Sequence, residues 1–151
     1  MPEMEIKIKP EEKMENGKNI PIPVHDYDDM QQAIKQLKKG KYIVHSQSNF
    51  NCCAFMVNKE SEKKRGKKRM VINYKPLNDI TIPFSYPIPD KSYLLKKIAN
   101  SKIFSHFDCK SGFYQICVKK EDQHKTTFSC PFEHFEWTIM PFGLMNAPSY
   151  F

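Results

Sequence analysis

The spacing of apolar side chains predicts an amphipathic helix in the first third of the chain. The apolar residues that recur at the three- and four-residue spacing of one helical face are Met30, Ala33, Ile34 and Leu37. Asp26 lies just before this face, where a capping residue is expected, and Gly40 lies just after it as a stop signal. The pattern therefore predicts a helix that ends at about residue 39.

Short apolar runs separated by turn residues or charged residues predict strands. The runs that predict strands are residues 42–44, 54–57, 70–72, 103–107, 126–129 and 135–140. Residues 54–57 and 70–72 flank a charged segment with one glycine, which predicts a hairpin with a basic tip. Residues 126–129 and 135–140 predict a second antiparallel pair.

Two further helices are expected, one on each side of the Asp108 region. Residues 80–89 are rich in proline and cannot be helical, whereas Asp90 can cap a helix over residues 91–99. A third helix is expected to begin near Ala147. Helices and strands alternate, but hairpin spacings dominate, so the fold class predicted is α+β.

Composition excludes several classes of protein. The chain has 151 residues, enough for one domain with a real core. No run approaches the roughly 18 apolar residues of a membrane span, so no membrane partner is expected. The five cysteines are odd in number and none are spaced Cys-x-x-Cys, which argues against a disulfide framework and a zinc cluster. An intracellular location with reduced thiols is expected, in the cytoplasm or the nucleus.

The net charge of +7 is concentrated in one segment. Residues 59–69 hold seven basic and two acidic residues, and so carry +5 of the +7. The basic residues of this segment are Lys59, Lys63, Lys64, Arg65, Lys67, Lys68 and Arg69. A local excess of positive charge predicts a binding site for an anion, whereas a diffuse excess would bear only on solubility.

Asp108 is the first candidate for chemistry. It ends the apolar run of residues 103–107 and is followed by a turn, so its carboxylate is expected at a sheet edge. Carboxylate oxygens are good ligands for Mg²⁺. Taken alone, the residue is better explained as an ordinary aspartate that caps a turn.

Four segments in order resemble the reverse transcriptases of long-terminal-repeat retroelements. They are Arg-Met-Val-Ile-Asn-Tyr-Lys-Pro-Leu-Asn at residues 69–78, Tyr-Pro-Ile-Pro at 86–89, Phe-Asp-x-Lys-Ser-Gly-Phe at 107–113 and Met-Pro-Phe-Gly-Leu-x-Asn-Ala-Pro at 140–148. Within that family the likeness is to plant pararetroviruses (caulimovirus-like) and gypsy-type elements. The resemblance covers about residues 26–151.

The resemblance implies a metal site at Asp108. Asp108 is similar to the first catalytic aspartate, which binds two Mg²⁺ ions, and the backbone carbonyl of Cys109 would help to bind one of them. Two-metal chemistry would activate the primer 3′-hydroxyl and stabilise the leaving pyrophosphate. Phe113 matches the steric gate that favours deoxynucleotides, and its alternative is core packing.

The resemblance also implies a nucleotide site. Arg69 matches the fingers arginine that binds the triphosphate, as suits a planar guanidinium with fixed charge. The candidates for a second phosphate contact are Lys63, Lys64 and Lys67, and their alternative is a solvated loop. Phe142 and Gly143 match the segment that packs against the nucleotide and the template base. Lys75 and Asn78 are similar to template-strand or structural positions.

The implied architecture is a right-hand polymerase that is incomplete in this chain. Residues 1–25 are expected to be a flexible lead-in or linker, and residues 26–151 the fingers and proximal palm. The family's Tyr-x-Asp-Asp hairpin is expected downstream of Phe151, and Tyr27-Asp28-Asp29 is interpreted as a helix N-terminus instead.

The predicted function is that of a fragment of an RNA-directed DNA polymerase that is inactive alone. Its implied partners are an RNA or DNA template with primer, deoxynucleoside triphosphates, and the remainder of a polyprotein (palm, thumb and ribonuclease H). The alternative is a non-catalytic nucleic-acid-binding remnant of a decayed retroelement.

Overall fold

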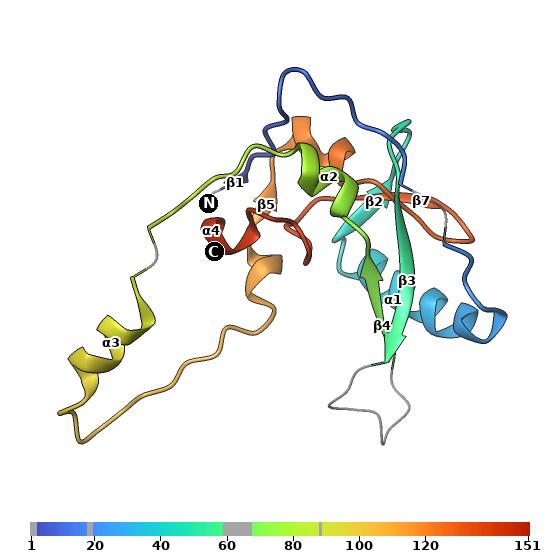
Figure 1. Cartoon of the computed structure of the whole chain (residues 1–151). Helices are drawn as coiled ribbons and strands as arrows, with labels where there is room; N and C mark the ends of the chain where they lie inside the picture. The colour runs from blue at the N-terminus through green and yellow to red at the C-terminus, as the bar shows by residue number, and fades with distance from the viewer. Residues whose placement is uncertain (1–2, 18–19, 59–67, 88) are drawn as a thin grey trace.

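A five-stranded sheet in the order β2-β7-β6-β3-β4 organises the computed structural model of the chain (Figure 1). The structure describes residues 3–17, 20–58, 68–87 and 89–151. The strands are β2 (Ile43–His45), β3 (Cys52–Asn58), β4 (Lys68–Ile72), β6 (Phe128–Ser129) and β7 (His134–Trp137). Mixed helix and sheet with this hairpin-rich order confirms the α+β prediction.

Both predicted antiparallel pairs are present. β3 pairs with β4 along a register that runs from Ala54 opposite Ile72 to Asn58 opposite Lys68. β6 pairs antiparallel with β7, and β7 pairs antiparallel with β2. β6 runs parallel to β3, which joins the two hairpins into one sheet. The tip of the β3–β4 hairpin, including Lys63, Lys64 and Lys67, lies outside the described residues.

Helix α1 (Tyr27–Lys39) confirms the predicted amphipathic helix. Met30 and Ile34 on its apolar face are buried, and the helix ends at Gly40, after which Lys41 has a positive φ of 57°. Asp28 and Asp29 lie in the first turn, where negative charge suits the helix dipole. The interpretation of Tyr27-Asp28-Asp29 as a helix N-terminus is therefore confirmed.

The core lies between the sheet, α1 and the short helix α2 (Lys75–Ile80), which the sequence pattern did not predict. Phe128 and Phe135 are fully buried on adjacent strands, with ring centroids 5.9 Å apart. Tyr74, at the start of α2, is also buried and donates its hydroxyl to the Thr126 carbonyl over 2.8 Å. Burial of a large apolar side chain contributes roughly 1.5–3 kcal/mol, so buried Tyr74 and its hydrogen bond hold the start of α2 in the core.

The prediction of a flexible lead-in is wrong for residues 3–8. β1 (Glu3–Met4) pairs in parallel with β5 (Cys117–Val118), and Met4 and Ile6 are each only 2 % exposed. Ile8 forms a bridge to Thr81. Met4, Ile6 and Ile8 occupy alternate positions, which is the spacing of a half-buried extended segment.

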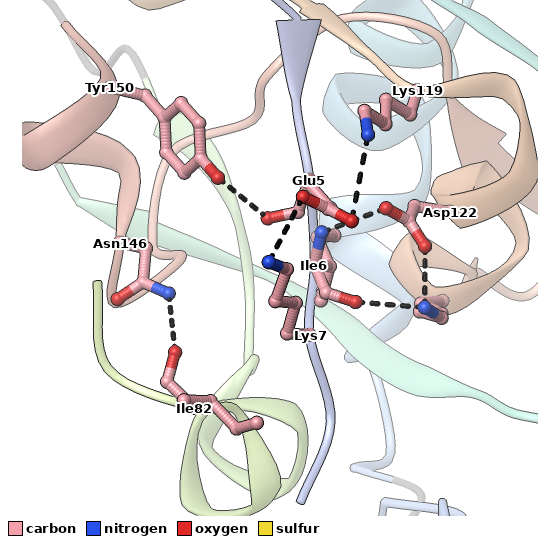
Figure 2. A network of polar contacts seen from close by, with 9 residues as sticks. Glu5, Ile6, Lys7, Ile82, Lys119, Asp122, Asn146 and Tyr150 are labelled. Atoms are coloured by element: carbon pink, nitrogen blue, oxygen red, sulfur yellow. Dashed lines mark hydrogen bonds and ion pairs between the residues drawn. The ribbon is translucent and has the colours of Figure 1, made fainter.

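Polar side chains hold this N-terminal segment in place (Figure 2). The Ile6 N–H donates to the Asp122 carboxylate and the Lys125 ammonium donates to the Ile6 carbonyl, each over 2.8 Å. Asp122 and Lys125 also pair with each other at 2.5 Å. Tyr150, near the other end of the chain, donates its hydroxyl to the Glu5 carbonyl.

The predicted strand at residues 103–107 is absent, although the helix before it is present. α3 (Lys91–Ile98) begins at Asp90, whose side chain accepts the Tyr93 N–H over 3.1 Å. The chain from Ile103 to Asp108 is irregular, with Ile103 89 % and Phe107 88 % exposed. α3 and this segment extend away from the sheet (Figure 1), so no described strand lies beside the run to accept its backbone hydrogen bonds.

A short final helix, α4 (Ala147–Tyr150), begins where the sequence predicts it. None of the helices in the described ranges is both long and apolar enough to cross a membrane.

Candidate functional site

A cavity of about 220 Å³ lies between β4 and the loop that follows β7. The residues that line it are Arg69, Met70, Val71, Ile72, Tyr114, Trp137, Phe142 and Gly143. It therefore brings together Arg69, Phe142 and Gly143, which come from two distant segments and which the family resemblance assigns to one nucleotide site. Three larger hollows in the described part of the molecule are lined by none of the predicted site residues.

Aromatic rings form one side of this cavity. The rings of Phe113 and Phe142 lie 5.0 Å apart at 35°, and Tyr114 lies 5.5 Å from Phe142. Tyr114 also contacts Trp137, with centroids 5.6 Å apart. Phe113 comes from the short 3-10 turn Gly112–Gln115 and is half-buried against the core. Its place beside Phe142 is compatible with both core packing and the steric-gate role, which stays a prediction.

Neighbouring cations on β4 have different surroundings. Lys68 forms an ion pair with Asp26, and the two side chains are 22 % and 8 % exposed. Arg69 is exposed and lines the cavity. Successive side chains of a strand point to opposite faces, so one cation is directed at α1 and the next at the cavity. Within the described residues, no carboxylate lies within 4.0 Å of the Arg69 guanidinium.

The charge of Arg69 also acts on the cavity wall. Burial raises the pKa of the Tyr114 hydroxyl, the nearby Tyr42 adds to the rise, and Arg69 opposes it. The Tyr114 phenol is therefore neutral at physiological pH. Tyr114 and Trp137 were not predicted as site residues. Tyr114 could have been predicted from its position next to Phe113. Trp137 could have been predicted from the alternation of aromatic residues along β7.

The loop after β7 has a backbone conformation that requires glycine. Gly143 has φ +95°, in the left-handed region that other residues rarely adopt. A Cβ at this position would meet Tyr74 at 3.6 Å, an ordinary contact, so the dihedral angle and not the space selects glycine. The Gly143 carbonyl accepts a hydrogen bond from the Asn78 side chain on α2.

The remaining predicted residues lie apart from the cavity lining. Asp108 and Cys109 are exposed on the irregular segment that precedes the Gly112–Gln115 turn. Lys75 forms an exposed ion pair with Asp79 at 3.1 Å. Among the described residues, no group of three His, Cys, Asp or Glu side chains could hold a metal ion.

A family model for reverse transcriptase (RNA-dependent DNA polymerase) matches residues 57–151. The chain belongs to this family. The match begins near the end of β3 and takes in Arg69, Asp108, Phe113 and the loop at Gly143. The resemblance inferred from the ordered segments is thereby confirmed.

The relatives of this reverse transcriptase chain include caulimovirus polyproteins. It is 46 % identical over 150 residues to the enzymatic polyprotein of Cauliflower mosaic virus (strain CM-1841), covering 99 % of this chain and 21 % of the relative. It is 41 % identical over 148 residues to that of Soybean chlorotic mottle virus, covering 97 % and 21 %. The chain thus spans about a fifth of the length of these relatives, and the pararetroviral likeness is confirmed.

Solved structures agree on the fold. The chain superposes on Prototype Foamy Virus protease-reverse transcriptase with a TM-score of 0.82 at 23 % identity, covering 99 % of this chain and 19 % of that one. A foamy viral protease-reverse transcriptase in complex with an RNA/DNA hybrid matches with a TM-score of 0.71 at 21 % identity, covering 88 % and 17 %. The arrangement of helices and strands is therefore that of a reverse transcriptase.

Proposed function

We propose that residues 26–151 are the fingers and proximal palm of an RNA-directed DNA polymerase that adds deoxynucleotides to a primer end by two-metal phosphoryl transfer. The observation that carries this proposal is the cavity at β4, which Arg69 lines together with Phe142 and Gly143. These residues come from separate segments of the chain, and each matches a nucleotide-binding position of the family. The chain's net charge of +7 suits a polyanionic partner.

Each residue has a distinct part in the proposed reaction. Arg69 binds the triphosphate, because its guanidinium is always charged and can bond two phosphate oxygens at once. Phe142 and Gly143 form the surface against which the nucleotide packs. Phe113, in contact with the Phe142 ring, leaves no room for a ribose 2′-hydroxyl and so favours deoxynucleotides.

The described residues fit only part of a magnesium site. The exposed Asp108 carboxylate and the Cys109 carbonyl are oxygen donors of the kind that Mg²⁺ prefers. One carboxylate does not suffice for two ions, and these 151 residues include no Tyr-x-Asp-Asp sequence. We therefore assign the other ligands to further chain in the complete enzyme, where bound Mg²⁺ would neutralise the charge that develops on the phosphates.

Further chain is also proposed as the cover of the exposed apolar segment. Ile103, Phe104 and Phe107 are 89 %, 64 % and 88 % exposed, which is unusual for neighbouring large apolar residues. Since the relatives are about five times longer, we propose that palm, thumb and ribonuclease H residues of a polyprotein pack here. A primed RNA or DNA template and deoxynucleoside triphosphates are the other proposed partners. The foamy viral relatives bound to dsDNA and to an RNA/DNA hybrid support the first of these.

Primer extension tests this proposal. On a poly(rA)/oligo(dT) template we expect no incorporation by the 151-residue chain, and incorporation by a longer polyprotein segment that adds the Tyr-x-Asp-Asp region. In the longer protein, Asp108→Ala should reduce the rate by at least about 10³-fold, because removal of a metal ligand disables the catalytic unit.

Two results would contradict the proposal. Incorporation by the 151-residue chain above its Asp108→Ala control would show that the chain needs no further carboxylates. A longer protein that binds template and primer but incorporates nothing would favour the alternative, a nucleic-acid-binding remnant.

A further inference from the structure

The side chain of Asn78 binds the backbone of the cavity loop at two points. Its Nδ2 donates to the Gly143 carbonyl over 2.8 Å, and its Oδ1 accepts the Met145 N–H over 2.9 Å. The two partners are 65 and 67 residues away in sequence. Because this amide donates to one backbone group of the loop and accepts from another, it holds the loop at a fixed distance from α2.

Asn78 is itself held in a fixed place. The helix α2 that carries it is preceded by Tyr74, whose hydroxyl donates to the Thr126 carbonyl in the core. Leu77, the preceding residue, is fully buried, and the Asn78 N–H donates to the Tyr74 carbonyl over 2.8 Å. The side chain therefore projects from a rigid support, which is what accurate placement of a loop requires.

The loop so held is the one that lines the cavity. Gly143 accepts the hydrogen bond, and Phe142, the residue before it, contacts the ring of Phe113. Apart from the aromatic contacts, Phe142 has little to fix it, because 56 % of its surface is exposed. Movement of the Gly143 peptide would therefore change the position of the Phe142 ring relative to Arg69, which also lines the cavity.

We propose that Asn78 is a positioning residue for nucleotide binding: it sets the Phe142–Gly143 segment at the distance from β4 that the incoming nucleotide requires. This inference rests on the proposed function of the cavity. It differs from a template-contact role, because the partners of both polar atoms of the Asn78 amide are backbone groups of the loop.

A second asparagine provides a useful contrast. Asn146, at the far end of the same loop, donates to the Ile82 carbonyl over 2.8 Å and accepts the Phe84 N–H over 3.0 Å. It therefore anchors the chain after α2 and not the cavity lining. Asn78 is the residue whose loss would free the Gly143 end of the loop.

The test uses a polymerase-competent protein that includes residues 1–151 and carries Asn78→Ala or Asn78→Asp. We expect either variant to raise the KM for the deoxynucleotide about tenfold, while kcat and the Kd for template and primer change less than about twofold. Asp keeps the acceptor for Met145 but loses the donor to Gly143. Hydrogen exchange of the segment that includes Met145 should become at least about tenfold faster in Asn78→Ala.

Asn73→Ala is the matched control. The Asn73 side-chain oxygen accepts the Lys75 N–H at the start of α2 over 3.2 Å. Asn73 is not bonded to the loop, so its replacement should leave the nucleotide KM unchanged. A weaker Kd for template and primer with an unchanged nucleotide KM would overturn the inference in favour of template contact. Unchanged Met145 exchange in Asn78→Ala would also overturn it. If the unsubstituted protein incorporates no nucleotide, the proposed function fails, and hydrogen exchange still tests the positioning separately.

Discussion

At the scale of single residues, Lys68 and Arg69 show how neighbouring cations acquire different roles. The Lys68 ammonium pairs with the almost fully buried Asp26 carboxylate. This ion pair links β4 to the start of α1. His25 also lies 3.5 Å from the Asp26 carboxylate, but it is exposed. Lys68 is thus a structural cation, and Arg69 is left for the cavity.

We expect Lys68→Met to lower the free energy of unfolding by about 2–3 kcal/mol, because it leaves the Asp26 carboxylate buried without its partner. Urea denaturation of the 151-residue chain measures this loss. Lys75→Met is the control, since its exposed pair with Asp79 should contribute under about 0.5 kcal/mol. The double substitution Lys68→Met with Asp26→Leu should recover most of the loss. Equal effects of Lys68→Met and Lys75→Met would show that the buried pair contributes nothing special.

At the scale of elements, the N-terminal segment is built into the fold through its backbone, and Ile6 has side-chain partners on both its N–H and its carbonyl. The N–H and carbonyl of Ile6 are bonded by Asp122 and Lys125, and the Ile6 side chain is buried. Further along the segment, the backbone bonds residues 80–82: the Lys9 N–H donates to the Ile80 carbonyl, and the Ile82 N–H donates to the Lys7 carbonyl. The segment therefore joins the 3-10 turn Lys120–Thr126 to the end of α2.

Asp122→Ala should destabilise the chain by about 3 kcal/mol, because it leaves the Ile6 N–H without an acceptor and Lys125 without its counter-ion. The comparison is Glu5→Ala, which removes only the partly exposed ion pairs with Lys7 and Lys119 and should cost under about 1 kcal/mol. Urea midpoints of both variants provide the measurement. A loss for Asp122→Ala no larger than that for Glu5→Ala would mean that the segment is not held as described.

Prediction from sequence succeeded where one element carries its own signal. α1 has a complete apolar face with a glycine stop, and the β3–β4 hairpin has apolar strands on both sides of a charged tip. It failed where the outcome depends on distant partners. Residues 103–107 have the apolar character of a strand but no described strand beside them, and residues 3–8 are ordered by Asp122 and Lys125.

The candidate site divides in the same way. Motifs indicated Arg69, Phe142 and Gly143, which the structure places around one cavity. Nothing in the motifs indicated that the Asn78 amide would bond the Gly143 and Met145 backbone, because that contact depends on how α2 packs against the sheet. The opposite environments of Lys68 and Arg69 also depend on where α1 begins.

At the scale of the whole molecule, the charge pattern predicts how nucleic acid binding responds to salt. Lys68 is paired with Asp26, so we expect the phosphate contacts of the basic segment to involve Lys63, Lys64, Arg65 and Lys67, which lie outside the described residues. Replacing these four by Gln should make the slope of log Kobs against log salt shallower by about 3, since each phosphate contact releases close to one counter-ion.

The matched control replaces four exposed lysines outside the hairpin, Lys13, Lys35, Lys39 and Lys120, by Gln. Fluorescence anisotropy of a labelled primer–template between low and moderate salt gives both slopes. The control has the same net charge as the hairpin variant, so a slope that changes equally in both would mean that binding responds to total charge and not to the hairpin.

The strand order has a consequence for the time at which the protein can fold. β2 and β3 are neighbours in sequence, but β7 and β6 separate them in the sheet, with Ile43 opposite Trp137 and Cys52 opposite Phe128. During synthesis, α1 and the β3–β4 hairpin can form early, whereas the facing edges of β2 and β3 stay unpaired until β7 has left the ribosome. Unpaired strand edges are sites of aggregation, so a ribosome paused between residues 58 and 137 would expose this chain at its most vulnerable stage.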